Sequence, residues 1–461
     1  MNIEDQLYRF LGLYYDLPQP ISSFIGTLYR HIPRSITMGR RYSEFTDLCT
    51  ELAENRELTR EYVEREFIRT IRSAEKTPFY KSLYSDYGIS FSSIKNIEDL
   101  PRLPTIDKIS LKENFEQLIV PGQKNNSLYL TTGGSTGTPV GFLLEKGVSR
   151  AKETAFLEHI WSTVGYHHGD RIAIIRGIDL GRGRLCLVDA IKNALMLSSY
   201  HITESNIDLY LDELNKYKPK FIHAYPSAAY SIARILRKLG KTLDFSPVAI
   251  LCGSENLYDQ HVKLVEDVFK TKVLGWYGHA ERVLLAIREQ TGQYSFFSAY
   301  GIAELLTDDG QPMGDGAGTG ILCGTSLHNE VMPLVRYMTD DTASGCRSVD
   351  GRLVVSSLDG RRHEFVYSTE DRPVSMAAIN IHSDEFDSIE RFQFVQSEKG
   401  AVTFEYASKA ALDAAAIRAI EKVLTSKLGD GFDLKLIRVK EIPLTKSGKQ
   451  TFLRQEIRPT E

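Results

Sequence analysis

The chain has 461 residues, 42% of them hydrophobic and 25% charged, which is enough for roughly two or three ordinary globular domains. Its formal net charge of -4 gives no overall basic field for binding nucleic acid or an anionic membrane, and its five dispersed cysteines argue against a disulfide framework or a structural zinc site. No apolar run approaches the ~18 residues of a membrane span and the start is acidic, so we expect a cytoplasmic protein.

The first 75 residues are predicted to be mostly helical. Val63, Phe67 and Ile71 recur at helical spacing within a charged segment. Pro78, Pro101 and Pro104 follow, and they are expected to interrupt helices and favour extended segments.

The middle of the chain alternates strands and helices. Residues 220–226, 247–255 and 272–278 read as buried strands, separated by helices. The first of these helices is expected to start with Ser227 as its N-cap and to stop at Gly240. This order predicts a parallel sheet, in which ligands gather beyond the carboxyl ends of the strands. Residues expected near one such crevice are Tyr225, Gly253, Glu255, Tyr277 and Glu281.

The last hundred residues change character. Two alternating runs around Ser397–Gly400 predict a hairpin, and residues 433–443 predict a third strand. A helix is expected between them at about 409–428, with Ile417, Ile420, Leu424 and Leu428 on one face. We therefore predict an α/β protein with a large domain over residues 1–360 and a small α+β domain over 361–461, joined by a hinge near 358–365.

Leu128–Gly141 is the most informative segment. It places four glycines and five Ser or Thr hydroxyls behind a short apolar strand. Glycine allows close backbone approach, so successive N–H groups and hydroxyls could surround a polyphosphate. No Lys-Ser/Thr pair follows the glycines, so this is not a Walker A loop. Taken alone, such a segment is more often a flexible loop.

Three further segments carry charged groups. Glu281 follows a predicted strand, where a carboxylate beside phosphates could hold Mg²⁺, although it could also cap a helix. Residues 333–341 end in paired acids that could accept ribose hydroxyls or form a surface turn. Lys449 lies on a Gly-containing turn, from which it could reach another domain's cleft or simply be solvated.

Together these motifs resemble the adenylate-forming superfamily of acyl-CoA synthetases, most closely its phenylacetate–CoA ligase-like branch with CapK-type proteins and coenzyme F390 synthetases. The resemblance covers residues of about 60–455 and rests on TPFYKSLY, LPRLPTIDK, YLTTGGSTGTP, HAYPS, CGSE, YGHAE, TSLHNEVMPLVRYMTDD, DGRR and TKSGK in the family's order. It implies a large domain with mixed and parallel sheets flanked by helices, and a small mobile C-terminal α+β lid.

The resemblance also implies roles for individual residues. Glu281 would hold Mg²⁺, Asp341 supported by Arg361 would hold the ribose of ATP, and Lys449 would contact the carboxylate and α-phosphate. Residues 362–364 would form the hinge. The β- and γ-phosphates would be cradled by Thr131, Thr132, Gly133, Gly134, Ser135, Thr136, Gly137 and Thr138, with Thr132 among the catalytic groups. The adenine and acyl pockets would be lined by Gly253, Ser254, Glu255, Trp276, Tyr277 and Gly278, and the acid by Tyr225, His279 and His201.

The implied activity is ATP-dependent formation of an acyl-adenylate from a small carboxylic acid, with release of pyrophosphate. The acceptor could be CoA, or an amine or hydroxyl during decoration of a surface polysaccharide. Two alternatives are AMP transfer to a cofactor and an inactive nucleotide-binding protein. The identity of the acid and the oligomeric state stay open.

Two positions depart from the family pattern. Ala280 replaces the usual Thr or Ser before the glutamate, which could weaken the hold on the α-phosphate. Asp340-Asp341 replaces the usual Gly-Asp, so either acid could take the ribose.

Overall fold

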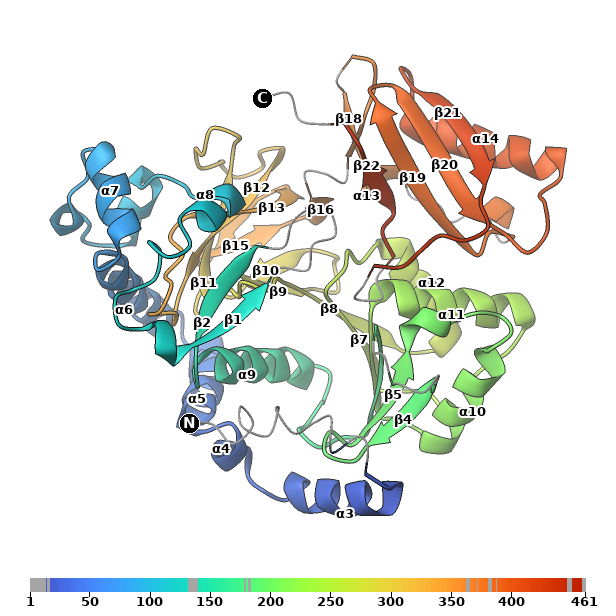
Figure 1. Ribbon diagram of the computed structural model, residues 1–461, viewed down its shortest axis with the longest axis horizontal. Helices are drawn as coiled ribbons and strands as arrows, with labels where there is room; N and C mark the ends of the chain where they lie inside the picture. Colours follow the sequence, from blue (N-terminus) through green and yellow to red (C-terminus); the bar gives the residue numbers. More distant parts are fainter. Residues whose placement is uncertain are drawn as a thin grey trace.

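The computed structural model describes residues 14, 17–131, 140–177, 180, 184–361, 365–370, 372–379, 384–386, 388–445 and 450–457 (Figure 1). Its N-terminal part is helical, as predicted, with α3 (Gln19–Arg30), α4 (Arg34–Thr37), α5 (Arg40–Glu54) and α6 (Arg56–Ala74). Val63, Phe67 and Ile71 are buried on one face of α6. None of the described helices is long and apolar enough to cross a bilayer.

Pro78 does not lead into an extended segment. It is the first residue of α7 (Pro78–Asp86), whose N-cap Thr77 accepts the amide of Tyr80. Proline is favoured at this position because its fixed φ suits a helix and its missing N–H would have no helical partner. The chain then continues into α8 (Lys108–Glu113).

A ten-stranded sheet forms the centre of the molecule, with strand order β14-β15-β10-β9-β8-β7-β6-β3-β5-β4. The strands from β8 to β5 in this order run parallel, as the alternating pattern predicted, and the flanking strands run antiparallel. The parallel strands are β3 (Ile172–Arg176), β5 (Ala194–Ser198), β6 (Phe221–Ala224), β7 (Ala249–Cys252) and β8 (Lys272–Gly278). The antiparallel strands are β4 (Cys186–Asp189), β9 (Leu285–Arg288), β10 (Tyr294–Phe296), β14 (Arg347–Val349) and β15 (Arg352–Val355).

Helices cover both faces of this sheet. On one face, α10 (Ile207–Tyr217), α11 (Pro226–Leu239) and α12 (Asp259–Phe269) pack on the apolar side chains of β3, β5, β6 and β7 (Figure 1). On the other face, α5 and α9 (Ser149–Ser162) pack on the alternate side chains. The parallel strands therefore end together at one edge, between two layers of helices.

The start of α11 differs from the prediction. The helix begins at Pro226 with Tyr225 as N-cap, so Ser227 lies inside the first turn. Its amide and hydroxyl both donate to the Glu255 carboxylate, at 2.9 and 3.1 Å. Gly240 ends the helix in the left-handed region at φ 63°, as expected.

A second, four-stranded antiparallel sheet lies beside the first (Figure 1). Its order is β11 (Gly301–Leu306), β12 (Thr319–Ser326), β13 (Tyr337–Ser344) and β16 (Ser357–Arg361). A separate hairpin of β1 (Ser127–Thr131) and β2 (Gly141–Glu145) packs on this part of the core. Its two strands flank the segment with the predicted phosphate loop.

The C-terminal module has the predicted hairpin, β19 (Arg391–Glu398) and β20 (Ala401–Ala407), and the predicted strand β21 (Asp433–Arg438). Its helix α14 (Ala414–Leu428) begins later than expected, because Asp413 caps the amides of Ala415 and Ala416. Ile420, Leu424 and Leu428 are buried. The sequence did not predict β22 (Leu453–Gln455), which pairs parallel to β19. The hairpin β17 (Phe365–Tyr367) and β18 (Pro373–Ser375) and the short helix α13 (Met376–Ile379) lie between β16 and this module.

Contacts join this module to the large sheet's helices. Lys409 pairs with Glu204 at 2.6 Å, and Arg234 donates to the Glu390 carbonyl at 2.6 Å. Phe452 packs edge-on against Tyr258, with ring centroids 6.2 Å apart. Phe452, directly before β22, therefore lies close to the start of α12, at the carboxyl-end side of the sheet.

Candidate active site

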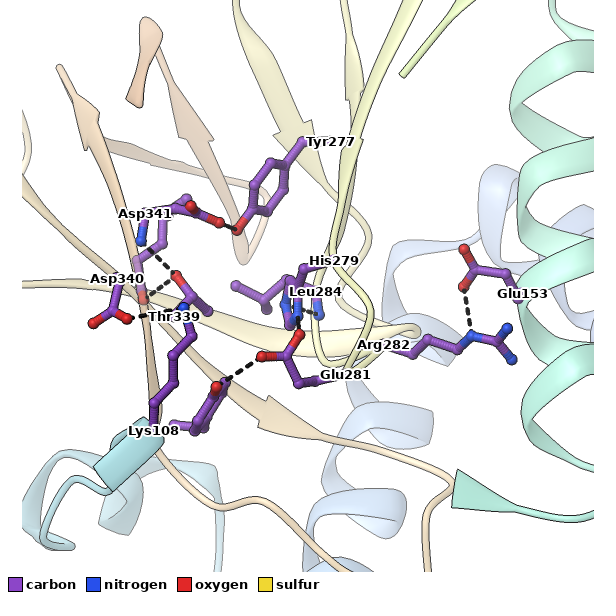
Figure 2. Close-up of polar contacts among 12 residues, drawn as sticks. Lys108, Glu153, Tyr277, His279, Glu281, Arg282, Leu284, Thr339, Asp340 and Asp341 are labelled. Carbon is purple, nitrogen blue, oxygen red and sulfur yellow. Dashed lines mark hydrogen bonds and ion pairs between the residues drawn. The ribbon is translucent and has the colours of Figure 1, made fainter. Parts of the chain in front are cut away.

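Two tyrosine hydroxyls cross-link the end of β8 to β13. Tyr277, on β8, donates to the Asp341 carboxylate on β13 at 2.7 Å (Figure 2). Tyr337, the first residue of β13, donates to the Glu281 carboxylate beyond β8, also at 2.7 Å. Burial and the partner carboxylate raise the pKa of each tyrosine, so both hydroxyls keep their protons. Each segment thus supplies the tyrosine that holds the acid of the other segment. The two predicted acids, Glu281 and Asp341, therefore lie in one site.

Glu281 is buried but ionised. Its other carboxylate oxygen is 3.1 Å from Nδ1 of His279, whose Nε2 accepts the Leu284 amide at 3.2 Å (Figure 2). Because Nε2 accepts a bond, Nδ1 carries the proton and donates to Glu281. Burial alone would raise the pKa of Glu281, but the bonds from His279 and Tyr337 outweigh burial and lower the pKa to about 2.

The two neighbouring acids at the end of the ribose motif have different environments. Asp340 has φ 67°, the left-handed region that favours glycine, and its carboxylate pairs with Lys108 of α8 at 2.9 Å. The Asp341 amide donates a hydrogen bond to the Thr339 hydroxyl, and the Asp341 carboxylate accepts one from the Tyr277 hydroxyl (Figure 2). Asp340 therefore has the backbone conformation that favours glycine and a carboxylate that faces Lys108, whereas the Asp341 carboxylate faces Tyr277.

Several predicted residues lie beyond what the structure describes. Thr132 to Thr138 of the phosphate loop, the hinge residues 362–364 and Lys449 are outside the described residues. Thr131 is the last residue of β1, and it pairs with Gly141 at the base of that loop. Arg361 pairs with Asp341 through the backbone of β16 and β13. The roles of these residues stay predictions.

Aromatic rings cover the carboxyl ends of β6, β7 and β8 on the α9 side. Trp276 lies 5.7 Å from Trp161 of α9 and 5.5 Å from His223, measured between ring centroids. Gly253 lies against Trp276, where a Cβ would come within 2.4 Å of the indole. Close packing of the indole explains the glycine of the predicted CGSE motif.

Arg176, the last residue of β3, reaches the same edge. Its guanidinium lies 4.5 Å above the ring centre of Tyr225 and donates to the Ser254 hydroxyl at 2.7 Å. Ser198 pairs with Arg176 at the end of β5, and its hydroxyl lies 3.3 Å from Nδ1 of His201. The predicted pocket residues Tyr225 and Ser254 therefore contact a cation, and His201 lies next to the neighbouring strand end.

Sequence reasoning missed Arg176 and Tyr337. The apolar run 172–175 would have identified β3 and placed Arg176 at its carboxyl end. Tyr337 stood inside a motif considered only for its acids.

A cavity of about 390 Å³ also opens between α5 and α6, away from this edge. Its three arginines pair with glutamates there, Arg41 with Glu44, Arg65 with Glu66 and Arg69 with Glu330.

The residues at β8 and β13 fit a magnesium nucleotide. The described parts of the chain hold no group of three or more His, Cys, Asp or Glu that could bind a metal by themselves. Mg²⁺ is commonly held by one or two carboxylates together with substrate phosphates, and each Glu281 oxygen keeps a lone pair beyond its present bond. Asp341 offers carboxylate oxygens of the kind that accept two ribose hydroxyls.

Two curated relatives match most of the chain. Protein CapK of Staphylococcus aureus is 24% identical over 396 residues, covering 82% of this chain and 85% of that protein. Phenylacetate–coenzyme A ligase of Thermus thermophilus is 26% identical over 328 residues, covering 66% and 72%. No family model matches the chain.

The predicted resemblance to the adenylate-forming superfamily, and within it to the phenylacetate–CoA ligase-like branch, is confirmed by these two relatives. The second relative is named as a ligase that joins a carboxylic acid to coenzyme A, which is the class of enzyme that the motifs predicted. The predicted fold class is confirmed by a solved 2-hydroxyisobutyryl-CoA ligase in its postadenylation state with an acyl-AMP, which aligns with TM-score 0.65 at 17% identity over 87% of this chain and 90% of its own. The same ligase in its thioesterification state aligns with TM-score 0.52 at 17% identity, over 88% of this chain and 90% of its own.

Proposed function

We propose that this protein belongs to the adenylate-forming superfamily, converts a carboxylic acid and ATP into an acyl-adenylate and pyrophosphate, and then passes the acyl group to an acceptor. The observation that supports this most directly is the reciprocal pair of tyrosine–carboxylate bonds between β8 and β13. It holds one ionised, buried carboxylate and one more accessible carboxylate in a single site. That combination suits a metal-bound triphosphate next to a ribose.

The proposed chemistry needs no protein nucleophile. An oxygen of the substrate carboxylate forms a bond to the α-phosphorus, and the bond from that phosphorus to the bridging oxygen breaks as pyrophosphate leaves. Asp341 would accept the ribose hydroxyls and orient the nucleotide. Magnesium, when bound at Glu281, would supply neutralisation of phosphate charge. The loop from Thr131 to Thr138 and Lys449 would add donors to the phosphates, on the basis of the family resemblance.

Exchange of labelled pyrophosphate into ATP, dependent on added acid, tests this proposal. We expect Lys449→Ala to slow exchange by about 10²–10³-fold, the scale of losing one preorganised charge-stabilising contact. Lys446→Ala removes the same charge from the same turn and serves as the matched control. Absence of exchange with a broad panel of acids would contradict the proposed activity and favour an inactive nucleotide-binding protein.

The acceptor is a separate part of the proposal. The matched ligases are named for CoA, whereas CapK carries no acceptor in its name. Supplying the enzyme with ATP, an active acid and either CoA or an amino sugar distinguishes a thioester product from an amide. Transfer to the sugar would support a role in surface-polysaccharide synthesis. AMP attached to an added cofactor would instead identify an AMP transferase.

We further propose that residues 361–461 act as a lid that rotates on the hinge near residues 358–365. Rotation would bring Lys449 to the α-phosphate for the first step and withdraw it for the second. The cytoplasmic location also stays a prediction.

A further inference from the structure

A cation with no counter-ion among the described residues lies where the substrate acid is expected to bind. Arg176 ends β3, at the edge where β5, β6 and β7 also end. Its side chain is half-buried, and its Nε is fully buried and has no hydrogen-bond partner in the part of the chain that the structure describes. Among the residues that the structure describes, none forms an ion pair with this guanidinium.

The groups that surround Arg176 are neutral. Nη2 donates to the Ser254 hydroxyl at 2.7 Å, and Nη1 lies 3.5 Å from Nε2 of His223. Burial, together with Arg176, lowers the pKa of His223 well below its usual value, so the imidazole carries no charge. The Tyr225 ring covers one face of the guanidinium. Neither ring nor hydroxyl balances the positive charge.

The acid that follows Ser254 accepts hydrogen bonds from another residue. Glu255 follows Ser254, but its two oxygens accept the amide and hydroxyl of Ser227 at the start of α11. Ser254 has φ 72°, and its hydroxyl holds the guanidinium in place. A guanidinium that is fixed, partly desolvated and uncompensated costs free energy unless a ligand supplies an anion.

We propose that Arg176 selects an acid with a second anionic group, the simplest case being a dicarboxylic acid. One carboxylate would be adenylated, and the other would pair with the Arg176 guanidinium. Planar guanidinium donors match a carboxylate in two parallel hydrogen bonds. The aromatic rings of Trp276, Trp161 and Tyr225 would contact the carbon skeleton between the two groups. This inference rests on the proposed acid activation and specifies its substrate class.

Matched pairs of acids test the proposal in the pyrophosphate-exchange assay. Glutarate is compared with pentanoate, and terephthalate with 4-methylbenzoate, so that each pair differs mainly in the second carboxylate. We expect the wild type to favour a diacid by about 10²-fold in kcat/KM, the scale of a paired charge in a partly buried site. Arg176→Met should remove this preference and leave the mono-acid within a few-fold.

Two controls keep the result interpretable. Arg347→Met removes an exposed arginine from β14, at the far edge of the same sheet, and should leave the selectivity unchanged. Arg176→Lys keeps the charge but loses the paired donors, so it should retain only part of the preference. Binding of the diacid by calorimetry to the wild type and to Arg176→Met adds a measurement that does not depend on turnover.

Each outcome separates this inference from the proposed function. Exchange with mono-acids but without preference for any diacid would overturn the role of Arg176 and leave acid activation intact. A rise in KM for CoA in Arg176→Met, with selectivity unchanged, would assign the arginine to the acceptor and also overturn the proposal. No exchange with any acid would refute acid activation itself.

Discussion

The charged groups at the two ends of the candidate site differ in how they are paired. At β8 and β13, both acids already accept bonds from the protein, Glu281 from His279 and Tyr337, and Asp341 from Tyr277. At the end of β3, the described groups that contact Arg176 are neutral, and none of them bonds to its Nε. The protein's own hydrogen bonds fix the acids of the first region, whereas the described residues leave the positive charge of the second region unbalanced.

This difference indicates a division of work. Groups of the kind proposed here to orient the nucleotide gain from being fixed in advance, because fixed groups need no reorganisation during reaction. A group that selects one acid among many gains from being left uncompensated, because the wrong ligand then leaves a charge unpaired. Breaking the fixed region should affect every substrate, whereas changing Arg176 should affect only one class.

The largest effect is expected from Glu281→Gln. It removes the charge proposed to hold magnesium while keeping the shape of the side chain and one acceptor oxygen. We expect exchange to fall by about 10²–10³-fold at limiting magnesium, with partial recovery at high magnesium.

A magnesium titration of the exchange rate, for each acid of the panel, measures this effect. Tyr337→Phe is the matched variant, since it keeps the carboxylate and removes one donor; it should have a smaller effect. Equal magnesium curves for Glu281→Gln and wild type would exclude the metal role.

Acid should destabilise the fixed region through the same carboxylate. The pKa of Glu281 is lowered to about 2 in the folded protein, below the ~4.3 of an unfolded Glu. The stabilisation of the folded protein by the ionised Glu281 carboxylate is therefore fully present above about pH 4.3 and is lost as the pH falls toward 2.

The pH dependence of unfolding measures this contribution. The shift sets an upper limit of about 3 kcal/mol in the free energy of unfolding. Denaturant unfolding of wild type and Glu281→Gln at pH 7 and pH 3 should show a steeper loss for the wild type. Parallel losses would mean that Glu281 is not held ionised by His279 and Tyr337.

Much of this region could be predicted from local sequence, and part of it could not. The strand at residues 272–278 has the predicted bounds because an apolar run ends at a turn, which is a local pattern. The bond from Tyr337 to Glu281 joins residues 56 positions apart, and the pattern of neither segment indicates the other. Motif order placed the acids in one site, but their hydrogen bonds depend on how β8 and β13 pack.

The same limit applies elsewhere. Gly240 ends α11 as predicted, because glycine accepts the left-handed conformation at low cost. Ser227 was expected to cap that helix, but Pro226 begins it and Glu255 takes both Ser227 donors. The partner that decided the outcome comes from a neighbouring strand end, which local rules for caps do not include.

A smaller effect should decide between the paired acids. Asp341→Asn removes a charge and one acceptor from the proposed ribose site, and hydrogen bonds to charged groups contribute about 1.5–3 kcal/mol. We therefore expect the KM for ATP to rise by about 10- to 100-fold, with any acid as co-substrate. Asp340→Asn, next to it, should change the KM for ATP by less than about twofold, because that carboxylate faces Lys108.

The smallest effect is expected from Asp340→Gly. The substitution relieves the strain of the left-handed backbone at φ 67° but removes the ion pair with Lys108. The side chains of Lys108 and Asp340 are 27% and 28% exposed, so solvent weakens this pair. These changes oppose each other and are each about 1 kcal/mol or less, so the free energy of unfolding should move by less than about 1 kcal/mol. Asp340→Ala loses the ion pair and keeps the strain, so it should be less stable than the glycine variant by about 1 kcal/mol. Denaturant unfolding compares the two, and the KM for ATP shows whether the site is intact. If Asp340→Gly weakened ATP as much as Asp341→Asn does, then Asp340 would be the acid on the ribose, and the fixed region would have to be reassigned.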